Sequence, residues 1–310
     1  MRVIITGGSG MIGTLLARSL IADGHEVIVL SRSPEKVTGL PAGAKAVKYD
    51  AQTAAGWAEY ADGADAIVNL AGESIAGYSF FPKRWTDESK RRIRESRLNA
   101  GKAVTEAVKA AKRKPRVVVQ TSAIGYYGVT GDKVLTEDNP PGGDFLASVC
   151  PPWEASTKEV EALGVRRPVF RGGIPFTTKG GALTRLLLPF KLFAGGWMGH
   201  GRQYLSWIHI DDYVAAIRFL IENESATGVY NLTAPQPITS RQFARIAGRV
   251  MKRPWFFPVP GFVLRLLFGE VSTVVLDGQR ALPERLLRDG FAFRYPEPEA
   301  ALRDILENRK

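Results

Sequence analysis

The stretch Thr6-Gly7-Gly8-Ser9-Gly10-Met11-Ile12-Gly13 decides the fold of this chain. It follows an apolar, β-branched run at residues 2–5, which is typical of a buried parallel strand, and it leads into an apolar pattern of helical spacing. In such a unit one glycine makes the tight turn, a second lets backbone N–H groups approach a pyrophosphate, and a third lets the helix pack closely on the strand. The spacing G-x-x-G-x-x-G therefore predicts a dinucleotide site, with a turn that holds no ligand as the alternative. We expect the binding residues of this turn to be Gly7, Ser9, Gly10, Met11, Ile12 and Gly13.

The end of the next expected strand, residues 26–30, favours NADP over NAD. NAD sites carry an acidic residue there, which accepts a hydrogen bond from the ribose 2′-hydroxyl. This chain has Ser31-Arg32-Ser33 instead, and arginine offers a fork of donors to a 2′-phosphate. We therefore predict NADP(H) as the cofactor, bound in part by Ser31 and Arg32. The alternative is that Arg32 is an exposed loop residue without a ligand.

Strand and helix patterns alternate along the chain and predict an α/β fold, a doubly wound parallel Rossmann sheet. We expect a Rossmann domain over residues 1–171, with parts of 203–235 completing the sheet. A smaller, mostly helical substrate lobe should cover residues 172–310, with Asp211 and Asp212 capping one of its helices. The other strand patterns lie at residues 46–49, 65–70, 116–120, 167–171 and 228–232, and the earlier helical patterns at 87–112 and 153–163.

The chain is basic, with a formal net charge of +11 over 310 residues. Two basic clusters, at residues 90–97 and 112–114, fall on the expected helix at 87–112 or at its end. We interpret them as a solvated helix face, with attraction of a phosphorylated ligand as the alternative. No zinc-ligand spacing or aromatic RNA-binding motif accompanies them, which argues against nucleic acid as a partner.

Cysteine content and hydropathy bear on the location of the protein. Cys150 is the only cysteine, so an internal disulfide is excluded. The most apolar run, residues 183–193, is interrupted by Arg185, Pro189 and Lys191, and the N-terminal residues do not resemble a signal peptide. We therefore expect a cytoplasmic protein that does not associate with a membrane.

Motifs at the ends of the fourth and fifth strands carry a family resemblance. Asn69-Leu70-Ala71-Gly72 and Thr121-Ser122-Ala123-Ile124-Gly125-Tyr126-Tyr127-Gly128, read with the glycine turn, resemble the extended short-chain dehydrogenase/reductase superfamily. The chain is most similar to its atypical branch of nucleoside-diphosphate-sugar epimerase-like, or cell-division-inhibitor-like, proteins. Residues 206–212, 278–283 and 291–296 carry that closer likeness, the last two in a family-specific C-terminal region at 255–305. The resemblance covers essentially the whole chain and implies a sheet of about seven strands, NADP(H) and a substrate lobe.

The resemblance also implies roles for further residues of the cofactor site. Residues after the fourth strand would line the adenosine and ribose, and Asp50 would approach the adenine amino group. The lining residues implied in this way are Asn69, Leu70, Ala71 and Gly72.

Two residues match catalytic positions of the superfamily. Asn99 matches a helix asparagine that orders a proton-relay water, and Ser122 matches the hydroxyl that bonds the reacting carbonyl. Structural alternatives remain open for both, because Asn99 can bridge backbone groups and Ser122 can simply end a strand.

The superfamily's Tyr-x-x-x-Lys pair is missing. In that pair the tyrosine is the general acid or base, and the lysine lowers the tyrosine pKa. Residues 145–158 contain no tyrosine, and the position of the lysine should fall near Trp153 or Glu154. Replacement proton donors are Tyr126 or Tyr127 on the Ser122 loop, and Glu154. We expect Cys150 to be a small buried hydrophobe and His209 a packing residue.

Two functions follow from these patterns. The first is an NADP-dependent oxidoreductase or epimerase that acts on an unidentified small molecule, with catalytic candidates Ser122, Tyr127, Glu154 and Asn99. The glycine-rich region 171–207 should border the substrate, with basic side chains facing an anion. The second is a non-catalytic NADP(H)-binding sensor or assembly factor, which the missing pair favours. A homodimer is left open.

Overall fold

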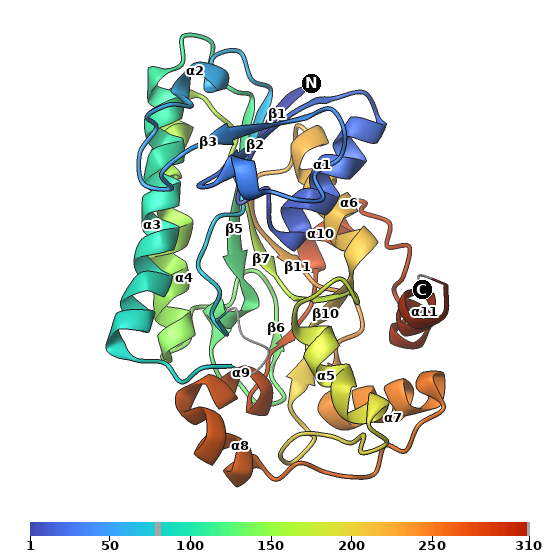
Figure 1. Cartoon of the computed structure of the whole chain (residues 1–310). Helices are drawn as coiled ribbons and strands as arrows, with labels where there is room; N and C mark the ends of the chain where they lie inside the picture. The colour runs from blue at the N-terminus through green and yellow to red at the C-terminus, as the bar shows by residue number, and fades with distance from the viewer. Residues whose placement is uncertain (78–81, 309–310) are drawn as a thin grey trace.

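A seven-stranded, fully parallel sheet forms the centre of the computed structural model, which describes residues 1–77 and 82–308. The strand order is β11-β7-β5-β4-β1-β2-β3, with a crossover between β1 and β4 (Figure 1). The inner strands are mostly apolar and buried, as expected of a parallel sheet covered on both faces, whereas the edge strand β3 exposes Lys45 and Lys48. This confirms the expected doubly wound fold. The strands are β1 (Arg2–Thr6), β2 (Glu26–Ser31), β3 (Ala44–Lys48), β4 (Ala66–Asn69), β5 (Val117–Ala123), β7 (Pro168–Gly172) and β11 (Gly228–Leu232).

Helices cover both faces of this sheet. On one face α3 (Asp87–Ala110) and α4 (Phe145–Ala155) lie side by side, with the short α2 (Ala58–Ala61) against α3. On the other face α1 (Met11–Ala22) packs on α6 (Ile210–Glu222). Alternate residues of one strand serve the two layers: Val3 and Ile5 pack on the α1 and α6 side, and Ile4 packs on the α3 side.

The second lobe has a core of its own, at the edge of the sheet where the strands end. It is built from α5 (Ala182–Lys191), α7 (Ser240–Met251) and α11 (Pro298–Arg303), whose aromatic and aliphatic side chains pack on Trp207. Three short strand pairs connect it: β8 (Ile174–Phe176) with β10 (Trp207–His209), β9 (Tyr204–Leu205) with β12 (Ile238–Thr239), and β6 (Val134–Leu135) with β13 (Arg280–Ala281). The remaining helices are α8 (Gly261–Phe268), α9 (Thr273–Leu276) and α10 (Glu284–Arg288); the single turns are η1 (Pro34–Lys36), η2 (Ile124–Tyr127), η3 (Lys158–Leu163), η4 (Gly269–Ser272) and η5 (Asp304–Asn308).

The helix expected at 153–163 was placed wrongly. Helix α4 begins at Phe145, where the Asp144 side chain accepts a hydrogen bond from the Ala147 N–H, and Pro151 and Pro152 lie inside it. Prolines usually mark the start or end of a helix, so the first two turns of α4, which precede Pro151, were not predicted. The expected second half is a separate 3₁₀ turn, η3.

The cap expected from Asp211 and Asp212 was also wrong. His209 is the N-cap of α6, and its Nδ1 accepts a hydrogen bond from the Asp211 N–H at 3.1 Å. The buried Asp212 carboxylate instead accepts the backbone N–H groups of Arg294 and Tyr295, and so holds the C-terminal segment.

Candidate functional site

Three glycines of the first turn differ in the space around their Cβ positions. Gly7 has a φ of +64°, and a Cβ there would lie 2.9 Å from the Leu70 backbone. A Cβ on Gly13 would lie 2.5 Å from the Gly8 Cα, so the third glycine sets the close approach of α1 to the turn. Gly10 is the least crowded of the three: among the described residues, one atom lies within 4 Å of its Cβ position, the Gly7 carbonyl oxygen at a tight 3.2 Å. The open position is the one expected to face the pyrophosphate.

The first turn of α1 presents its backbone N–H groups without a competing anion. Gly10 is the N-cap and makes no side-chain cap, and the first turn contains no acidic residue. Ser9 and Gly10 are exposed, and Met11 and Ile12 are half-buried. The positive end of the helix dipole therefore faces an accessible surface.

The ends of β2 and β3 lie beside this turn. Ser31 is buried, whereas Arg32 is exposed. Tyr49 follows β3 and lies near the Gly7 backbone; burial raises the Tyr49 pKa to about 12. The exposed Asp50 carboxylate caps its own turn, and the Thr53 and Gln52 backbone N–H groups lower its pKa.

Asn69 is part of a buried polar network under the site. Its Oδ1 accepts the Thr6 hydroxyl at 2.6 Å, and its Nδ2 donates to Gln120 Oε1 at 2.9 Å. Gln120 also accepts the Thr157 hydroxyl from beyond α4 at 3.1 Å. The network ties the ends of three strands together, so the Asn69 side chain is engaged within the protein.

The residues after Asn69 form the edge of the cleft. Leu70 is half-buried, Ala71 is nearly buried, and its N–H donates to the Thr6 hydroxyl at 3.3 Å. Gly72 is exposed, and a Cβ there would lie 3.2 Å from the guanidinium carbon of Arg97. That guanidinium in turn lies 4.7 Å from the ring centroid of Trp153 on α4.

Ser122 lies at the end of β5, facing α4. It is 2% exposed, and its hydroxyl, near the thiol of Cys150, is buried without a hydrogen-bond partner among the described residues. Burial raises the pKa of that thiol to about 11, so Cys150 has the character of a small hydrophobe. The Cys150 thiol also lies 3.8 Å from the Ala123 carbonyl oxygen, and a Cβ on Gly125 would lie 3.4 Å from Leu146. Leu146 and Cys150, four residues apart on one face of α4, therefore cover the end of β5.

Arg171 of β7 gathers two of the predicted proton donors. Its Nε and Nη2 donate to the two carboxylate oxygens of Glu154 at 2.8 and 3.2 Å, and its Nη1 donates to the Tyr127 hydroxyl at 3.0 Å. Its guanidinium carbon lies 3.3 Å from the ring centroid of Tyr126. Burial alone would lower the Arg171 pKa, but the bonds to Glu154 and Tyr127 raise it overall. The guanidinium is a fixed cation beneath the site.

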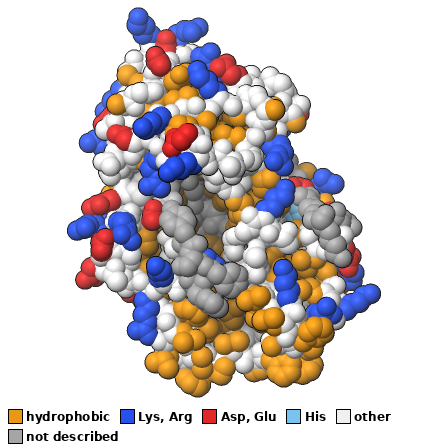
Figure 2. Space-filling view, viewed as in Figure 1, with side chains coloured by type: hydrophobic (Ala, Val, Ile, Leu, Met, Phe, Trp, Pro, Cys, Tyr) orange, Lys and Arg blue, Asp and Glu red, His pale blue; other side chains and the backbone are white. Residues whose placement is uncertain are grey.

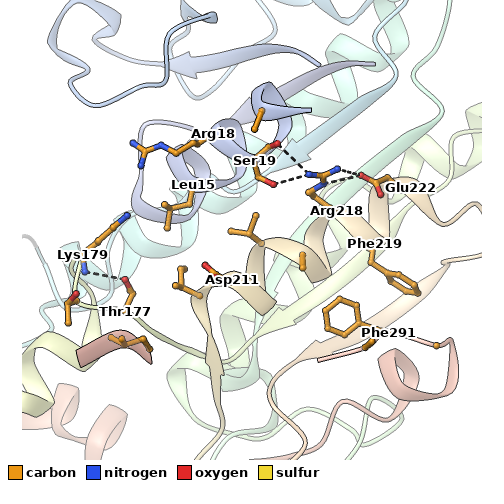
Figure 3. A pocket seen from close by; sticks show the side chains of 18 residues that line it. Leu15, Arg18, Ser19, Thr177, Lys179, Asp211, Arg218, Phe219, Glu222 and Phe291 are labelled. Carbon is orange, nitrogen blue, oxygen red and sulfur yellow. Dashed lines mark hydrogen bonds and ion pairs between the residues drawn. The ribbon is translucent and has the colours of Figure 1, made fainter. Parts of the chain in front are cut away.

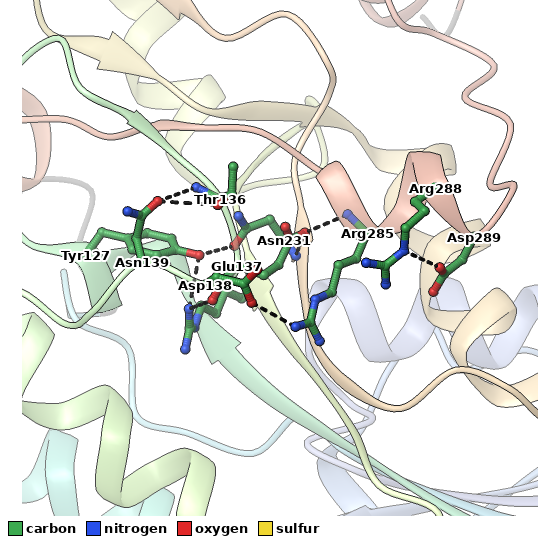
Figure 4. Close-up of polar contacts among 10 residues, drawn as sticks. Tyr127, Thr136, Glu137, Asp138, Asn139, Asn231, Arg285, Arg288 and Asp289 are labelled. Atoms are coloured by element: carbon green, nitrogen blue, oxygen red, sulfur yellow. Dashed lines mark hydrogen bonds and ion pairs between the residues drawn. The ribbon is translucent and has the colours of Figure 1, made fainter.

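Tyr127 continues this network to β11, the strand at one edge of the sheet. Its hydroxyl donates to Asn231 Oδ1 at 2.7 Å, and burial raises its pKa to about 12 (Figure 4). The Asn231 N–H donates to Glu137 Oε1 at 2.9 Å, and burial raises the pKa of the Glu137 carboxyl. The Arg285 N–H of α10 reaches the same oxygen at 3.3 Å. Tyr127 is 1% exposed, and its hydroxyl ties the loop after β5 to the neighbouring sheet strands β7 and β11.

The predicted catalytic set is therefore only partly brought together. Ser122 of β5 faces α4, and Glu154 is part of α4, whereas Asn99 is half-buried on α3. The structure does not present Tyr127 and Glu154 as accessible acids; their catalytic roles stay predictions. Sequence reasoning missed Arg171, and the signal was its charge within the otherwise apolar strand Pro168–Gly172.

A cavity of about 680 Å³ lies elsewhere, between the outer faces of α1 and α6 (Figure 3). The Arg218 side chain crosses it: its Nη1 donates a hydrogen bond to the Ser19 hydroxyl of α1 at 2.9 Å, and its guanidinium forms ion pairs with Glu222 and Asp23. The C-terminal segment closes it through Phe291. None of the predicted cofactor or catalytic residues lines it, so it is separate from the dinucleotide turn.

Two family models match the chain. That of the NAD dependent epimerase/dehydratase family covers residues 3–146, and a domain of unknown function, DUF1731, covers residues 259–305. The epimerase family protein YfhF of Bacillus subtilis is 38% identical over 311 residues, which span 100% of this chain and 99% of that protein. A chloroplastic epimerase family protein of Arabidopsis thaliana, an SDR39U1 homolog, is 38% identical over 309 residues, spanning 99% of this chain and 87% of that protein.

Solved structures agree with these sequence matches. The human epimerase family protein SDR39U1, crystallised with NADPH, is 33% identical with a TM-score of 0.86, covering 99% of this chain and 100% of that chain. A nucleoside-diphosphate sugar epimerase from Corynebacterium glutamicum is 31% identical with a TM-score of 0.77, covering 99% of this chain and 58% of that chain. These matches confirm the expected resemblance, including its distinct C-terminal region.

Proposed function

This chain belongs to the NAD dependent epimerase/dehydratase family, and from that premise we propose that it is an NADP(H)-dependent oxidoreductase or epimerase-like enzyme of the atypical short-chain dehydrogenase/reductase type. The observation that carries the proposal is the glycine turn, which is closed at Gly7 and Gly13 and open at Gly10. A small unidentified molecule is its substrate, and the single cysteine is in keeping with a cytoplasmic location.

The residues present fit a dinucleotide phosphate. The uncapped N–H groups at the start of α1 are donors for a pyrophosphate, and Gly10 leaves room for it. Ser31 and Arg32 are the groups for the 2′-phosphate, since the exposed guanidinium offers several donors and no acid follows β2 directly. Ala71 and Gly72 flank the ribose side, while Asn69 supports the turn from below through Thr6. Asp50 stands at the adenine end. NADPH bound to human SDR39U1 supports the same choice of cofactor.

Calorimetry tests this part of the proposal. We expect the purified protein to bind NADPH at least tenfold more tightly than NADH, because charge-assisted hydrogen bonds contribute about 1.5–3 kcal/mol each. Arg32→Asp should remove that preference, whereas Arg91→Asp, a charge change at an exposed position of α3, should leave it intact. Equal affinity of the parent protein for both cofactors would exclude an NADP site here.

The chemistry requires a proton donor other than the superfamily's helix tyrosine. Bound NADPH supplies a hydride to a carbonyl carbon; the carbonyl oxygen then needs a proton. Leu146 and Cys150 cover the end of β5. Leucine has no ionisable group, and burial shields the Cys150 thiol and raises its pKa, so neither residue is an accessible proton donor at neutral pH. Tyr126 keeps partial exposure on the loop after β5, and Arg171 fixes its ring. We assign proton donation to the Tyr126 hydroxyl, with Tyr127 and Glu154 acting through Arg171; Ser122 and Asn99 remain candidates for orienting the carbonyl.

The same observations favour a second function, an NADP(H)-binding sensor or assembly factor. Two groups predicted to donate protons are bonded to a buried arginine, and the Ser122 hydroxyl is buried. Oxidation of NADPH, followed optically with a panel of ketones, aldehydes and sugar nucleotides, separates the two functions. Turnover with any member supports the enzyme; tight NADPH binding with no turnover across the panel supports the sensor.

A further inference from the structure

Eight large apolar side chains are exposed at the end of the second lobe, and we call them the apolar patch. Figure 2 shows hydrophobic side chains gathered at the lower end of the molecule, where Figure 1 places α8 and α5. Phe262 and Leu266 of α8 are each 70% exposed. The patch consists of Leu192, Phe193, Phe256, Phe257, Phe262, Leu266, Leu267 and Val274.

Helix α8 has no buried residue, although six of its eight residues are large and apolar. An apolar helix in a globular protein normally buries one face, so this one presents its apolar surface to something outside the described chain. It is held firmly: the Arg84 side chain donates to the carbonyl oxygens of Leu266 and Leu267, and Lys90 of α3 pairs with Glu270 just beyond the helix. The patch is therefore fixed to the Rossmann domain.

The net positive charge of the protein is concentrated on the same lobe. Residues 172–210 and 225–269, which include all of the patch except Val274, contain ten Lys and Arg and no Asp or Glu. The rest of the chain has 32 Lys and Arg against 31 Asp and Glu. The basic clusters on α3 that stood out in the sequence are largely balanced by neighbouring acids, such as Glu88 and Glu95.

A basic cleft of about 410 Å³ adjoins the patch. It lies along α7, where Arg241, Arg245 and Arg249 recur every four residues on the exposed face, and it is lined by Arg245, Gly248, Arg249, Lys252, Arg253 and Trp255. One acid, Glu299 of α11, pairs with Arg249 at 2.7 Å. Arg253 joins the cleft to the patch, because its guanidinium carbon lies 4.1 Å from the ring centroid of Phe193.

We propose that the apolar patch and the basic face of α7 together form a docking surface for an anionic phospholipid bilayer. Aromatic and aliphatic side chains enter the boundary between headgroups and acyl chains, while adjacent Lys and Arg bind lipid phosphates. A second copy of the chain fits less well, since it would bring two positively charged surfaces together. Duplex DNA would use the cations but leave the exposed aromatic rings in water, because its bases are already stacked and paired.

Surface docking differs from the sequence expectation of a protein that does not associate with a membrane. Within residues 1–77 and 82–308, no helix is both long and apolar enough to span a bilayer. Peripheral docking needs no such helix, because the side chains reach only the interface. The proposal is independent of the activity proposed above.

Vesicle flotation with the purified full-length chain tests the docking surface. We expect the protein to float with vesicles of phosphatidylcholine containing about one third phosphatidylglycerol, to stay behind with phosphatidylcholine alone, and to lose binding as salt is raised. Phe262→Asp/Leu266→Asp and Arg245→Glu/Lys252→Glu should each lower partitioning at least about tenfold. The matched controls are Leu287→Asp, an exposed apolar position on α10, and Arg91→Glu/Lys102→Glu on α3, which should float like the parent. Circular dichroism checks that every variant is folded.

Several results would overturn the proposal. Absence of flotation, flotation unaffected by the patch variants, or equal binding to neutral vesicles each excludes an anionic bilayer. A dimer in sedimentation velocity that Phe262→Asp dissociates, without flotation, would assign the patch to a second copy. Retention on duplex DNA that Arg245→Glu/Lys252→Glu abolishes and Phe262→Asp/Leu266→Asp leaves unchanged, again without flotation, would assign the surface to nucleic acid.

Discussion

Arg171 and Glu154 form a two-point ion pair, Nε to Oε1 at 2.8 Å and Nη2 to Oε2 at 3.2 Å, in which the arginine side chain is 3% exposed and the glutamate 14%. The pair joins β7 to α4 directly beneath the end of β5. A planar guanidinium that binds a carboxylate through two parallel bonds fixes orientation as well as distance. The helix that in the superfamily carries the proton-transferring tyrosine is thus fixed to the sheet by a structural charge.

We expect Glu154→Gln to lower the free energy of unfolding by about 3–5 kcal/mol, because it leaves a buried guanidinium without its counter-charge. The double variant Arg171→Met/Glu154→Leu should lose less than the single variant, since neither charge is then buried alone. Urea denaturation measures both, with Glu159→Gln, whose exposed carboxylate pairs with Lys109, as the unaffected control. A Glu154→Gln protein of parental stability that loses turnover would restore Glu154 as a proton donor.

The two ends of the glycine turn should respond differently to substitution. Gly10 has φ −75° and ψ 169°, a backbone conformation that any residue adopts, and its Cβ would need only a small shift of the Gly7 carbonyl oxygen at 3.2 Å, so Gly10→Val should lower the thermal midpoint without cofactor much less than Gly13→Ala. The branched side chain of Gly10→Val would occupy the pyrophosphate path and should weaken NADPH binding at least tenfold. Gly13→Ala places a Cβ 2.5 Å from the Gly8 Cα and should instead destabilise the fold by about 1–3 kcal/mol. If Gly10→Val bound NADPH like the parent in calorimetry, the dinucleotide would lie elsewhere.

Cys150 should be unreactive in the folded protein. Burial raises its pKa to about 11, so only about a thousandth of the thiol is ionised at pH 8, and the thiolate is the reactive form. Alkylation by iodoacetamide, followed by mass spectrometry, should therefore be slow and should accelerate about tenfold per pH unit below that pKa. In urea the same cysteine should react with an ordinary pKa of about 8.5. Rapid alkylation of the native protein at pH 8 would make Cys150 a candidate nucleophile.

The sequence predicted the sheet because its strands are apolar, β-branched runs separated by glycine turns, as at residues 2–6 and 26–31. It did not predict where α4 begins, since Pro151 and Pro152 resemble a helix start and the Asp144 cap lies among glycines and prolines. The cofactor turn is local in the chain, so its residues follow from spacing alone. The environment of Tyr127 depends on Arg171 and Asn231, which are 44 and 104 residues away and meet it only through the order of the strands.

The distribution of net charge depends on the fold for a related reason. Lys90, Arg91 and Arg92 form an obvious run, but Glu270, Glu95 and Glu88 pair with them in space or one helical turn away. The cations on α7 are spaced four residues apart and attract less notice in the sequence. They lie together on one exposed face only because the chain there is helical.

The neighbouring tyrosines Tyr126 and Tyr127 provide the sharpest test of the chemistry. Tyr127→Phe removes a buried hydroxyl that bonds both Asn231 and Arg171, so it should lower the free energy of unfolding by about 1–3 kcal/mol in urea denaturation. Tyr126→Phe keeps the ring beside Arg171 and should barely change stability. If Tyr126 donates the proton, its loss should lower turnover of NADPH with an identified carbonyl substrate at least tenfold, with NADPH affinity unchanged.

The comparison of these two variants distinguishes the donors even though both lie on one loop. A Tyr127→Phe protein assayed well below its thermal midpoint should retain most of its turnover, because the Tyr127 hydroxyl ties the loop after β5 to strands β7 and β11, and burial keeps its pKa at about 12. The reverse pattern, with turnover lost in Tyr127→Phe and kept in Tyr126→Phe, would mean that the Tyr127–Asn231 bond opens during the reaction. Full turnover in both variants would exclude the loop after β5 as the proton source. It would leave the substrate itself, or a group carried by the second lobe, as the donor.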